Sequence, residues 1–430
     1  MSALVLELEH PSSAAVAGHC RMCGEALSQT FVDLGMSPLC ESYVTRDRLD
    51  DVEAFYPLHV LVCGNCFLVQ LKEYVSPDHI FSEYAYFSSY STSWVAHAKR
   101  YCEAIQARLG LGSNSLVVEL ASNDGYLLQH FRPLGVPVLG IEPAANVAKV
   151  ACDRGVPTLV EFFGARLADR LASEGTQADL IVGNNVLAQV PDLNDFTAGM
   201  ARLLAPGGVI TLEFPHLERL MAENQFDTIY HEHFSYFSLV TIERLAARHG
   251  LKLIDVEELA THGGSLRVYL GHQASSHTTA PAVAALLARE RGLGFERLQT
   301  YLAFAEQVKQ TKRRLLSYLI EAKNAGRRIC GYGAPGKGNT LLNYCGIGTD
   351  FLDFTVDRST YKQGRFTPGM RIPILLPDAI DKFRPELVLI LPWNIKDEII
   401  QQMRHIGEWG GRFVVPIPEV TVIDPKELRR

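Results

Sequence analysis

The run Glu119-Leu120-Ala121-Ser122-Asn123-Asp124-Gly125-Tyr126-Leu127 (ELASNDGYL) decides the fold of the largest part of this chain. It follows the apolar residues 116–118 and reads as the end of a buried strand, a turn of small and polar residues, and the start of a helix. Such a turn lets backbone amides approach a ligand in the crevice at the carboxyl end of a parallel sheet. The stretch therefore predicts a ligand site in an α/β domain.

The residues around this turn predict the rest of that domain. Strand-like runs recur at 138–141, 180–182 and 209–212, with a helical segment near 195–204, and this alternation indicates a parallel sheet wrapped by helices. Glu142 closes the second strand, where a carboxylate is suited to accept both ribose hydroxyls of a nucleoside. An amphipathic helix is expected before the turn, at 87–111, and two further strands after it, at 251–256 and 266–270.

Composition limits the class of protein. With 430 residues and 47% hydrophobic content, the chain can bury two or three cores. A net charge of -7 argues against a broad nucleic-acid interface. The first residues lack the positive charge of a secretory signal, and no apolar run approaches the roughly 20 residues that span a bilayer. We therefore expect a cytoplasmic protein that uses neither nucleic acid nor membrane as partner.

Four of the nine cysteines form two C-x-x-C pairs, Cys20 with Cys23 and Cys63 with Cys66. Each pair can direct two thiolates at one tetrahedral zinc ion, so residues 1–80 are expected to form a module held by a structural zinc. Four unconnected core thiols remain the alternative. A redox pair is less well supported, because no thioredoxin-like pattern surrounds either motif.

A second α/β domain is expected at the C-terminus. Residues 81–282 hold the first α/β domain and end in the small, polar stretch 272–282, and a long charged helix is expected at 283–325. Strand-like runs then recur through 326–430 and predict a smaller Rossmann-like domain. Its glycine loop at 331–340 nearly spells a P-loop, but Gly338 replaces the magnesium-binding hydroxyl, so a diphosphate cradled by backbone amides and Lys337 is favoured over ATP hydrolysis.

The run Tyr230-His231-Glu232-His233-Phe234-Ser235-Tyr236-Phe237 gathers acids, bases and aromatic rings in eight residues. We call residues 230–233 the YHEH box. A zinc-protease motif would need a second histidine where Ser235 stands, so this interpretation fails. Acid–base chemistry on a bound substrate is the remaining functional interpretation, and core histidines satisfied by hydrogen bonds are the alternative, above all for His231.

The turn, Glu142 and two further segments, 178–187 (ADLIVGNNVL) and 203–208 (LLAPGG), resemble S-adenosylmethionine-dependent methyltransferases with a seven-stranded sheet, the class I fold. That resemblance implies S-adenosylmethionine as cofactor, with Glu142 holding the ribose. The cofactor-binding residues expected from it are Ser88, Glu119, Ala121, Asn123, Asp124, Gly125, Leu127, Glu142 and Asn185.

The order of parts along the chain resembles one family more closely, the sugar C-methyltransferases. The two C-x-x-C pairs flank 33–39 (DLGMSPL), and 84–89 (YAYFSS), the cofactor domain, the YHEH box and the glycine loop follow. These enzymes methylate nucleotide-linked 4-keto-deoxyhexoses at a ring carbon beside the ketone, most familiarly C-3 and in others C-5. A nucleotide-sugar substrate, here a dTDP-linked 4-keto-6-deoxyhexose, and a monomer or weak homo-oligomer are expected.

The resemblance also implies residue roles. His233 is expected as the base that removes the proton, with Tyr230, Glu232 and Tyr84 arranging the sugar and its enolate. A neutral histidine accepts a proton at cellular pH, because its ordinary pKa is about 6.5. The substrate-binding residues expected are His262, Gly263, Ser265, Arg267, Tyr332, Lys337, Asn339 and Lys362.

One position departs from the family. A histidine is usual before Val-Pro after the fourth strand, where this chain has Gln189, which donates hydrogen bonds but exchanges no proton. An O- or N-methyltransferase, or a nucleotide-sugar-binding protein without turnover, is therefore kept as an alternative. An NAD-dependent oxidoreductase that uses the glycine loop is disfavoured, because the first α/β domain carries the better nucleoside site.

Overall fold

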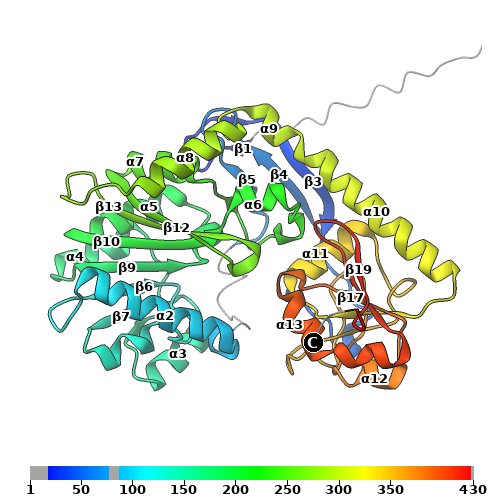
Figure 1. The fold of residues 1–430 in the computed structure, drawn as a ribbon. Coiled ribbons are helices and arrows are strands. Elements are labelled where there is room, and N and C mark those ends of the chain that lie inside the picture. The colour runs from blue at the N-terminus through cyan, green and yellow to red at the C-terminus, as the bar shows by residue number, and fades with distance from the viewer. Residues whose placement is uncertain (1–17, 77–86, 428–430) are drawn as a thin grey trace, which may run out of the picture.

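The computed structural model describes residues 18–76 and 87–427, which form two α/β domains and an N-terminal β-module between them (Figure 1). The first domain lies on the left of Figure 1 and the C-terminal domain on the right. The N-terminal module bridges them at the top of this view. Among the described residues, no helix is both long and apolar enough to cross a bilayer.

The first domain is built on the predicted seven-stranded sheet, with strand order β12-β13-β10-β9-β6-β7-β8. Neighbours from β10 to β8 pair in parallel, whereas β13 is antiparallel to both β10 and β12. The expected class I methyltransferase sheet is thereby confirmed. The strands are β6 (Val117–Leu120), β7 (Val138–Ile141), β8 (Thr158–Leu159), β9 (Ala178–Asn184), β10 (Leu204–Pro215), β12 (Leu251–Leu259) and β13 (Ser265–His272).

Alternating apolar residues of the strands divide the core into two layers. Val117 packs in one cluster with Tyr101 and Ile105, whereas the next residue, Val118, packs in the other. In Figure 1, α2 and α3 lie below the sheet and α5 and α7 above it. The helices are α2 (Thr92–Leu109), α3 (Ala145–Asp153), α4 (Ala165–Ser173), α5 (Leu193–Leu203), α6 (Leu217–Ala222) and α7 (Leu239–Arg248). The helix expected from residue 87 begins only at Thr92, after the N-cap Ser91.

The N-terminal module is a small β-structure that recruits a strand from the first α/β domain. Its sheet has the order β11-β5-β4-β3, and β11 (Ser235–Tyr236) comes from the segment that follows the YHEH box. The β5 strand pairs antiparallel with β11, and Leu71 N donates to Phe234 O at 2.9 Å. The other strands are β1 (Gly18–His19), β2 (Ala26–Leu27), β3 (Gln29–Ser37), β4 (Tyr56–Val62) and β5 (Val69–Leu71).

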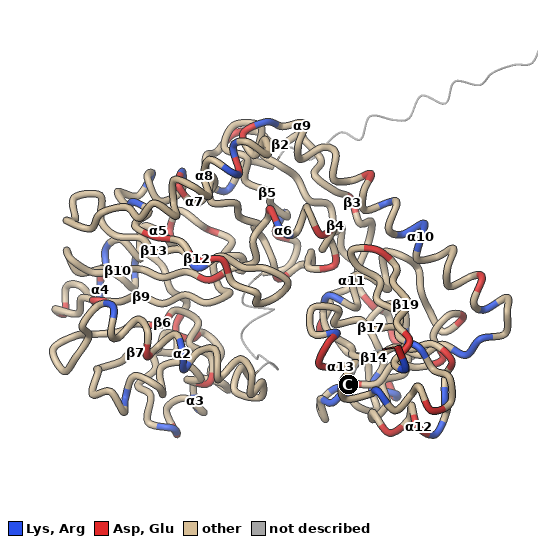
Figure 2. The backbone as a smooth tube through the Cα atoms, viewed as in Figure 1, with Lys and Arg blue, Asp and Glu red and all other residues tan. Residues whose placement is uncertain are grey.

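The single long helix expected at 283–325 is three helices. Gly294, at φ 93°, ends the first of them, α8 (Pro281–Leu293), and α9 (Leu298–Leu302) and α10 (Phe304–Asn324) follow. The apolar side of α10 packs inward: the Phe304 ring stacks on Phe31 of β3 at 4.7 Å. Positions of Lys, Arg, Asp and Glu recur along α10, which runs at the edge of the molecule in this view (Figure 2). These helices therefore connect all three parts.

The C-terminal domain is the predicted second Rossmann-like unit. Its six-stranded sheet has the order β16-β15-β14-β17-β18-β19, with only the last pair antiparallel. The strands are β14 (Ile329–Tyr332), β15 (Thr355–Val356), β16 (Ile374–Leu375), β17 (Leu387–Ile390), β18 (Arg412–Val415) and β19 (Thr421–Ile423), and the helices are α11 (Gly336–Cys345), α12 (Ala379–Phe383) and α13 (Lys396–Gln402).

Candidate active site

The turn after β6 has a strained backbone, which contacts with neighbouring residues must stabilise. Ala121 (φ 54°), Asn123 (φ 50°) and Gly125 (φ 76°) all adopt left-handed backbone conformations, which cost about 1–2 kcal/mol for a residue with a side chain. A side chain at the third position would be both strained and crowded, because φ is positive and a Cβ atom there would lie 3.2 Å from Cβ of Ala151 in α3. Leu127, just after the turn, is buried in the core and anchors it.

Glu142, at the end of β7, fixes this turn from the neighbouring strand. One carboxylate oxygen accepts a hydrogen bond from Asn123 N and the other from Ala144 N, each at 2.9 Å. Burial raises the pKa of Glu142, and the two amides oppose that rise. The side chain lies at the predicted strand end, and each oxygen keeps one lone-pair direction for a ligand. Its ribose contact stays a prediction.

The segment before α2 packs on the same turn. Ser88 N donates to Asn123 Oδ1 at 2.9 Å, and the Ser89 hydroxyl donates to Asp124. Arg154 forms an ion pair with Asp124 at 3.2 Å. The polar side chains of the turn are therefore partly used to hold its shape, and Ser88 lies beside it as expected.

Several buried polar atoms around the carboxyl ends of β6 and β9 have no partner among the described residues. They are Glu119 Oε2, Asp124 Oδ1, Asn185 Oδ1 and both polar atoms of the Asn184 amide. Burial, then the nearby Glu142 and Asp124 carboxylates, raises the pKa of Glu119. Unsatisfied buried groups are costly, so this donor and acceptor set fits a ligand that carries an ammonium group and hydroxyls, as S-adenosylmethionine does.

Aromatic rings extend the site from the turn toward the loop before β13. The Trp94 ring stacks on Tyr126 at 6.1 Å and meets His262 edge-on at 5.3 Å. His262 Nε2 and Asn185 Nδ2 lie 3.3 Å apart. These contacts place His262 beside Trp94 and Asn185, near the turn after β6.

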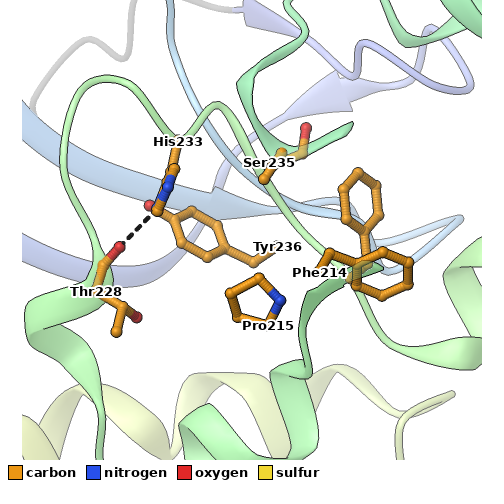
Figure 3. Close-up of a pocket in the computed structure, with 8 residues that line it drawn as sticks. Phe214, Pro215, Thr228, His233, Ser235 and Tyr236 are labelled. Carbon is orange, nitrogen blue, oxygen red and sulfur yellow. Dashed lines mark hydrogen bonds between the residues drawn. The ribbon is translucent and has the colours of Figure 1, made fainter. Parts of the chain in front are cut away.

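His233 is oriented by a single backbone group. Its Nδ1 lies 2.9 Å from Thr228 O, and because a carbonyl can only accept, Nδ1 carries the hydrogen and Nε2 is the free acceptor (Figure 3). Burial, and then the positive charge of Lys337, lowers the pKa of His233 to about 4. The ring packs against Tyr230 at 4.0 Å, and the small pocket beside it is lined by Tyr236 and Phe214.

The other two members of the YHEH box face the N-terminal module. His231 is buried between Tyr56 and Tyr74, and its Nε2 lies 3.3 Å from Pro57 O. That placement supports the structural interpretation of His231. Glu232 is buried beside the Cys40 thiol, which lies 3.9 Å away, and burial raises the pKa of Glu232 to about 8. Glu232 therefore carries a proton at neutral pH.

Gln189 lies next to the YHEH box. The Leu187–Gln189 turn follows β9, and Phe234 N donates to Ala188 O at 2.7 Å, which joins the two segments. The Gln189 amide is partly buried and makes no side-chain hydrogen bond to another described residue. It is thus available to a ligand.

The C-terminal domain closes this region with a tryptophan. Trp393 Nε1 donates to Asp227 Oδ2 at 2.7 Å. A Cβ atom on Gly263 would lie 2.7 Å from the Trp393 ring, so glycine is needed for the two α/β domains to meet. Lys337, at the start of α11, donates to Asn394 Oδ1 at 3.0 Å with its ammonium 4.7 Å from the centre of the Trp393 ring.

The remaining predicted residues of the C-terminal domain face the N-terminal module or their own sheet. Lys362 Nζ donates to Ala334 O at 2.9 Å and lies 3.6 Å from the Glu41 carboxylate. Asn339 Nδ2 donates to Cys40 O at 2.6 Å. Tyr332 OH donates to Gln402 Oε1 at 3.4 Å.

Two predicted substrate ligands lie within the first sheet instead. Arg267 is buried and forms ion pairs of 2.9 Å with both Glu213 and Glu257. Ser265 Oγ donates to Thr261 O at 3.0 Å. Arg267 therefore stabilises the sheet through these ion pairs, and its position gives no support to a role in substrate binding. Tyr84 lies outside the described residues.

The four cysteines of the C-x-x-C pairs converge as predicted. Their sulfur atoms all lie within 4.8 Å of one another, with 3.5 Å between Cys20 and Cys66 and between Cys23 and Cys63. A tetrahedral zinc with Zn–S bonds of about 2.3 Å needs sulfur separations of about 3.8 Å. The set is a closed four-cysteine site, which suits a structural zinc and leaves no position for substrate.

Sequence reasoning missed Trp94, Asp227 and Trp393. All three stand outside the short motifs, and only the packing of the domains brings them to the site. The Trp393 side chain lies 166 residues from Asp227 along the chain, so no local pattern could have paired them.

Comparisons with known proteins agree with this geometry. Family models match three consecutive parts: a zinc binding domain at residues 20–81, a methyltransferase domain at 94–256 and a C-methyltransferase C-terminal domain at 260–418. The C-methyltransferase NovU of Streptomyces niveus is 39% identical over 404 residues, which cover 94% of this chain and 96% of NovU.

The chain belongs to the C-methyltransferase family. This C-methyltransferase is an S-adenosylmethionine-dependent enzyme with a four-cysteine zinc module. The chain is also similar to a ubiquinone biosynthesis O-methyltransferase of Chelativorans sp. (strain BNC1), at 27% identity over 95 residues, which cover 22% of this chain and 38% of that protein. A magnesium protoporphyrin IX methyltransferase structure from Synechocystis PCC 6803 is similar over 41% of this chain and 80% of the Synechocystis chain, at 15% identity and a TM-score of 0.31.

Proposed function

We propose that this C-methyltransferase methylates a nucleotide-linked 4-keto-6-deoxyhexose, carried by dTDP, at the ring carbon beside the ketone, with C-3 as the preferred position. The order of motifs and the likeness to NovU over nearly the whole chain support C-methylation. The glycine loop at the start of α11, in a second Rossmann-like domain, supports a nucleotide carrier.

The observation that carries the proposal is the hydrogen bond from His233 to Thr228. It fixes the tautomer whose Nε2 is free to accept a proton, and the lowered pKa keeps that nitrogen unprotonated at neutral pH. A carbon beside a ketone becomes a nucleophile only after it loses a proton. A positioned neutral imidazole is a group that can remove this proton.

Other residues around His233 are assigned to support of the box or to the oxygen atoms of the sugar. Glu232 is buried beside Cys40 on the side of the N-terminal module, so its protonated carboxyl is assigned to support of the box rather than to direct contact with the sugar. Tyr230, packed on His233, and Gln189, on the adjoining turn, offer a hydroxyl and an amide to the oxygen atoms of the sugar. S-adenosylmethionine bound at the turn after β6 supplies an electrophilic methyl group to the carbon nucleophile.

Two narrower alternatives differ in the atom that is methylated. Methylation at C-5 would use the same base from the other side of the ketone. An O- or N-methyltransferase would need no acidic C–H, and Gln189 in place of the usual histidine favours that alternative.

The test is a mass and NMR experiment. The purified enzyme is incubated with S-adenosylmethionine and a panel of dTDP- and GDP-linked 4-keto-deoxyhexoses, and carbon NMR locates any new methyl group. A methyl on C-3 supports the proposal, and one on C-5 corrects the position. A methyl on oxygen or nitrogen, or no transfer to any sugar of the panel, contradicts it.

A further inference from the structure

Lys337 is the one lysine of the glycine loop, and its side chain lies toward the first α/β domain. Its ammonium group rests near the Trp393 ring and donates to Asn394, and both residues follow β17 on the side of the C-terminal domain that meets Asp227. The same Trp393 ring contacts Gly263, next to His262. These contacts place Lys337 at the domain junction, and Thr340 of the same helix donates to Ile229 O at 3.0 Å, directly before the YHEH box.

Among the described residues, the surroundings of Lys337 contain a single fixed counter-charge. Asp227 attracts the ammonium group, and its carboxylate is already held by Trp393 Nε1. Burial lowers the pKa of Lys337 and Asp227 opposes the shift. With one acceptor in Asn394, the ammonium keeps N–H donors for a ligand.

The positive charge of Lys337 reaches both histidines of the site. Burial is the largest cause that lowers the pKa of His233 and of His262, and the charge of Lys337 is the second largest cause that lowers it. The other titratable groups that face His233 are Tyr230, Tyr236 and His262. Glu232 of the same box is buried on the side of Cys40 and is protonated at neutral pH. Within the described part of the chain, Lys337 is therefore the cation that acts on the proposed base.

We propose that Lys337 stabilises the enolate oxygen of the substrate across the domain junction, rather than the diphosphate. This inference rests on the proposed function. His233 Nε2 takes the proton as the C–H bond breaks, the C–H electron pair forms the carbon–carbon double bond, and the carbonyl pair moves onto the oxygen. That oxygen gains a full negative charge, which a fixed ammonium group in a water-poor site stabilises strongly.

Proton exchange tests this step without methyl transfer. The enzyme is mixed with dTDP-4-keto-6-deoxyglucose and S-adenosylhomocysteine in D2O, and proton NMR follows the loss of the ring protons beside the ketone. In Lys337→Met we expect exchange to slow about 100-fold, whereas Lys337→Arg, which keeps the charge, retains more of it. The matched control is Lys382→Met, an exposed lysine of α12 in the same domain, which should exchange at the wild-type rate.

The affinity for dTDP separates the two roles of Lys337. If Lys337 held the diphosphate, Lys337→Met would weaken dTDP binding by an order of magnitude or more in calorimetry. We expect a change below about twofold. A large loss of dTDP affinity with normal exchange would overturn the inference.

A titration of the free protein keeps the inference separate from the choice of sugar. In Lys337→Met the pKa of His233, followed by NMR of labelled histidine, should rise, because a neighbouring positive charge is removed, and Lys382→Met should not move it. An unchanged His233 titration contradicts the inference whatever the substrate is. If Lys337→Met shows the expected shift in the His233 pKa but the wild-type enzyme exchanges no ring proton, the result contradicts the proposed function instead. If Lys337→Met proves unstable, Asn394→Ala takes its place. It removes the acceptor that fixes Lys337 and should give an intermediate exchange rate.

Discussion

At the scale of single residues, His233 and His231 differ by their partners and so should differ in mutation. His233→Asn keeps a donor for Thr228 but has no proton acceptor in place of Nε2, so methyl transfer should fall at least about 100-fold with little change in S-adenosylmethionine affinity. His231→Asn is the matched control, since it should lower the melting temperature through lost packing on Tyr56 and Tyr74 while the folded enzyme keeps most of its rate. Equal rates in both folded variants would contradict the assignment.

Glu232 should make stability depend on pH. Its pKa is about 8 in the folded protein and about 4.3 when unfolded, so between these values the folded state holds a proton that the unfolded state has lost. Its stabilising contribution is fully present below about pH 4.3 and is lost as pH rises toward 8, by at most about 1.4 kcal/mol per pH unit. Glu232→Gln does not titrate, so its free energy of unfolding relative to wild type should increase from pH 5 to pH 8.

Denaturant unfolding at several pH values measures this difference. Glu174→Gln, at an exposed carboxylate, is the control and should show no such trend. A Glu232→Gln variant whose relative stability stays constant across the range would show that Glu232 is ionised in the folded protein.

At the scale of elements, both α/β domains use the same device. Glu142 at the end of β7 accepts Asn123 N from the turn after β6, and Asp357 at the end of β15 accepts Ala334 N from the turn after β14, at 2.9 and 2.7 Å. Glu142→Gln replaces one acceptor by a donor and disturbs the first turn only. We expect S-adenosylmethionine and S-adenosylhomocysteine to bind at least tenfold more weakly, about 1.4 kcal/mol.

Calorimetry with S-adenosylhomocysteine tests this prediction. Asp357→Asn makes the equivalent change in the other domain and should leave that affinity within about twofold. Equal losses in the two variants would mean that both domains share in cofactor binding.

At the scale of the whole molecule, the zinc module supports the active site through its sheet. The YHEH box continues into β11, which pairs with β5 directly after the second C-x-x-C pair. Cys23→Ser should therefore abolish zinc binding, lower the free energy of unfolding on the order of 4 kcal/mol, and reduce methyl transfer. Cys152→Ser changes an exposed cysteine outside the cluster and should retain zinc and stability.

Zinc content by plasma mass spectrometry and thermal melting of the two variants provide the measurement. A Cys23→Ser protein with a full equivalent of zinc would contradict the assignment of the four cysteines as its ligands. Zinc loss with unchanged turnover would contradict the support of the YHEH box by β5.

The sequence by itself determined the parts of this protein, because each part is specified by residues close together in the chain. Alternating strand and helix patterns predicted a parallel sheet and a second α/β domain, the family resemblance implied that the first sheet has seven strands, and the spacing of four cysteines predicted their cluster. The turn at 119–127 and the acid at Glu142 lie on adjacent parallel strands, so their contact also followed from local order. Prediction from local sequence was less accurate for the bounds of helices. The helix expected at 283–325 is interrupted at Gly294.

Only the tertiary structure decided which side chains share the same surroundings. Arg267 resembles a ligand in sequence, yet the antiparallel register of β13 with β10 places it opposite Glu213, and the ion pair uses its charge. His231 and His233 are two residues apart, but one faces the N-terminal module and the other the domain junction. Trp393 and Lys337 reach that junction from the last domain. Such long-range contacts depend on how whole sheets and helices pack, which buries charge and shifts pKa values in ways that no local pattern encodes.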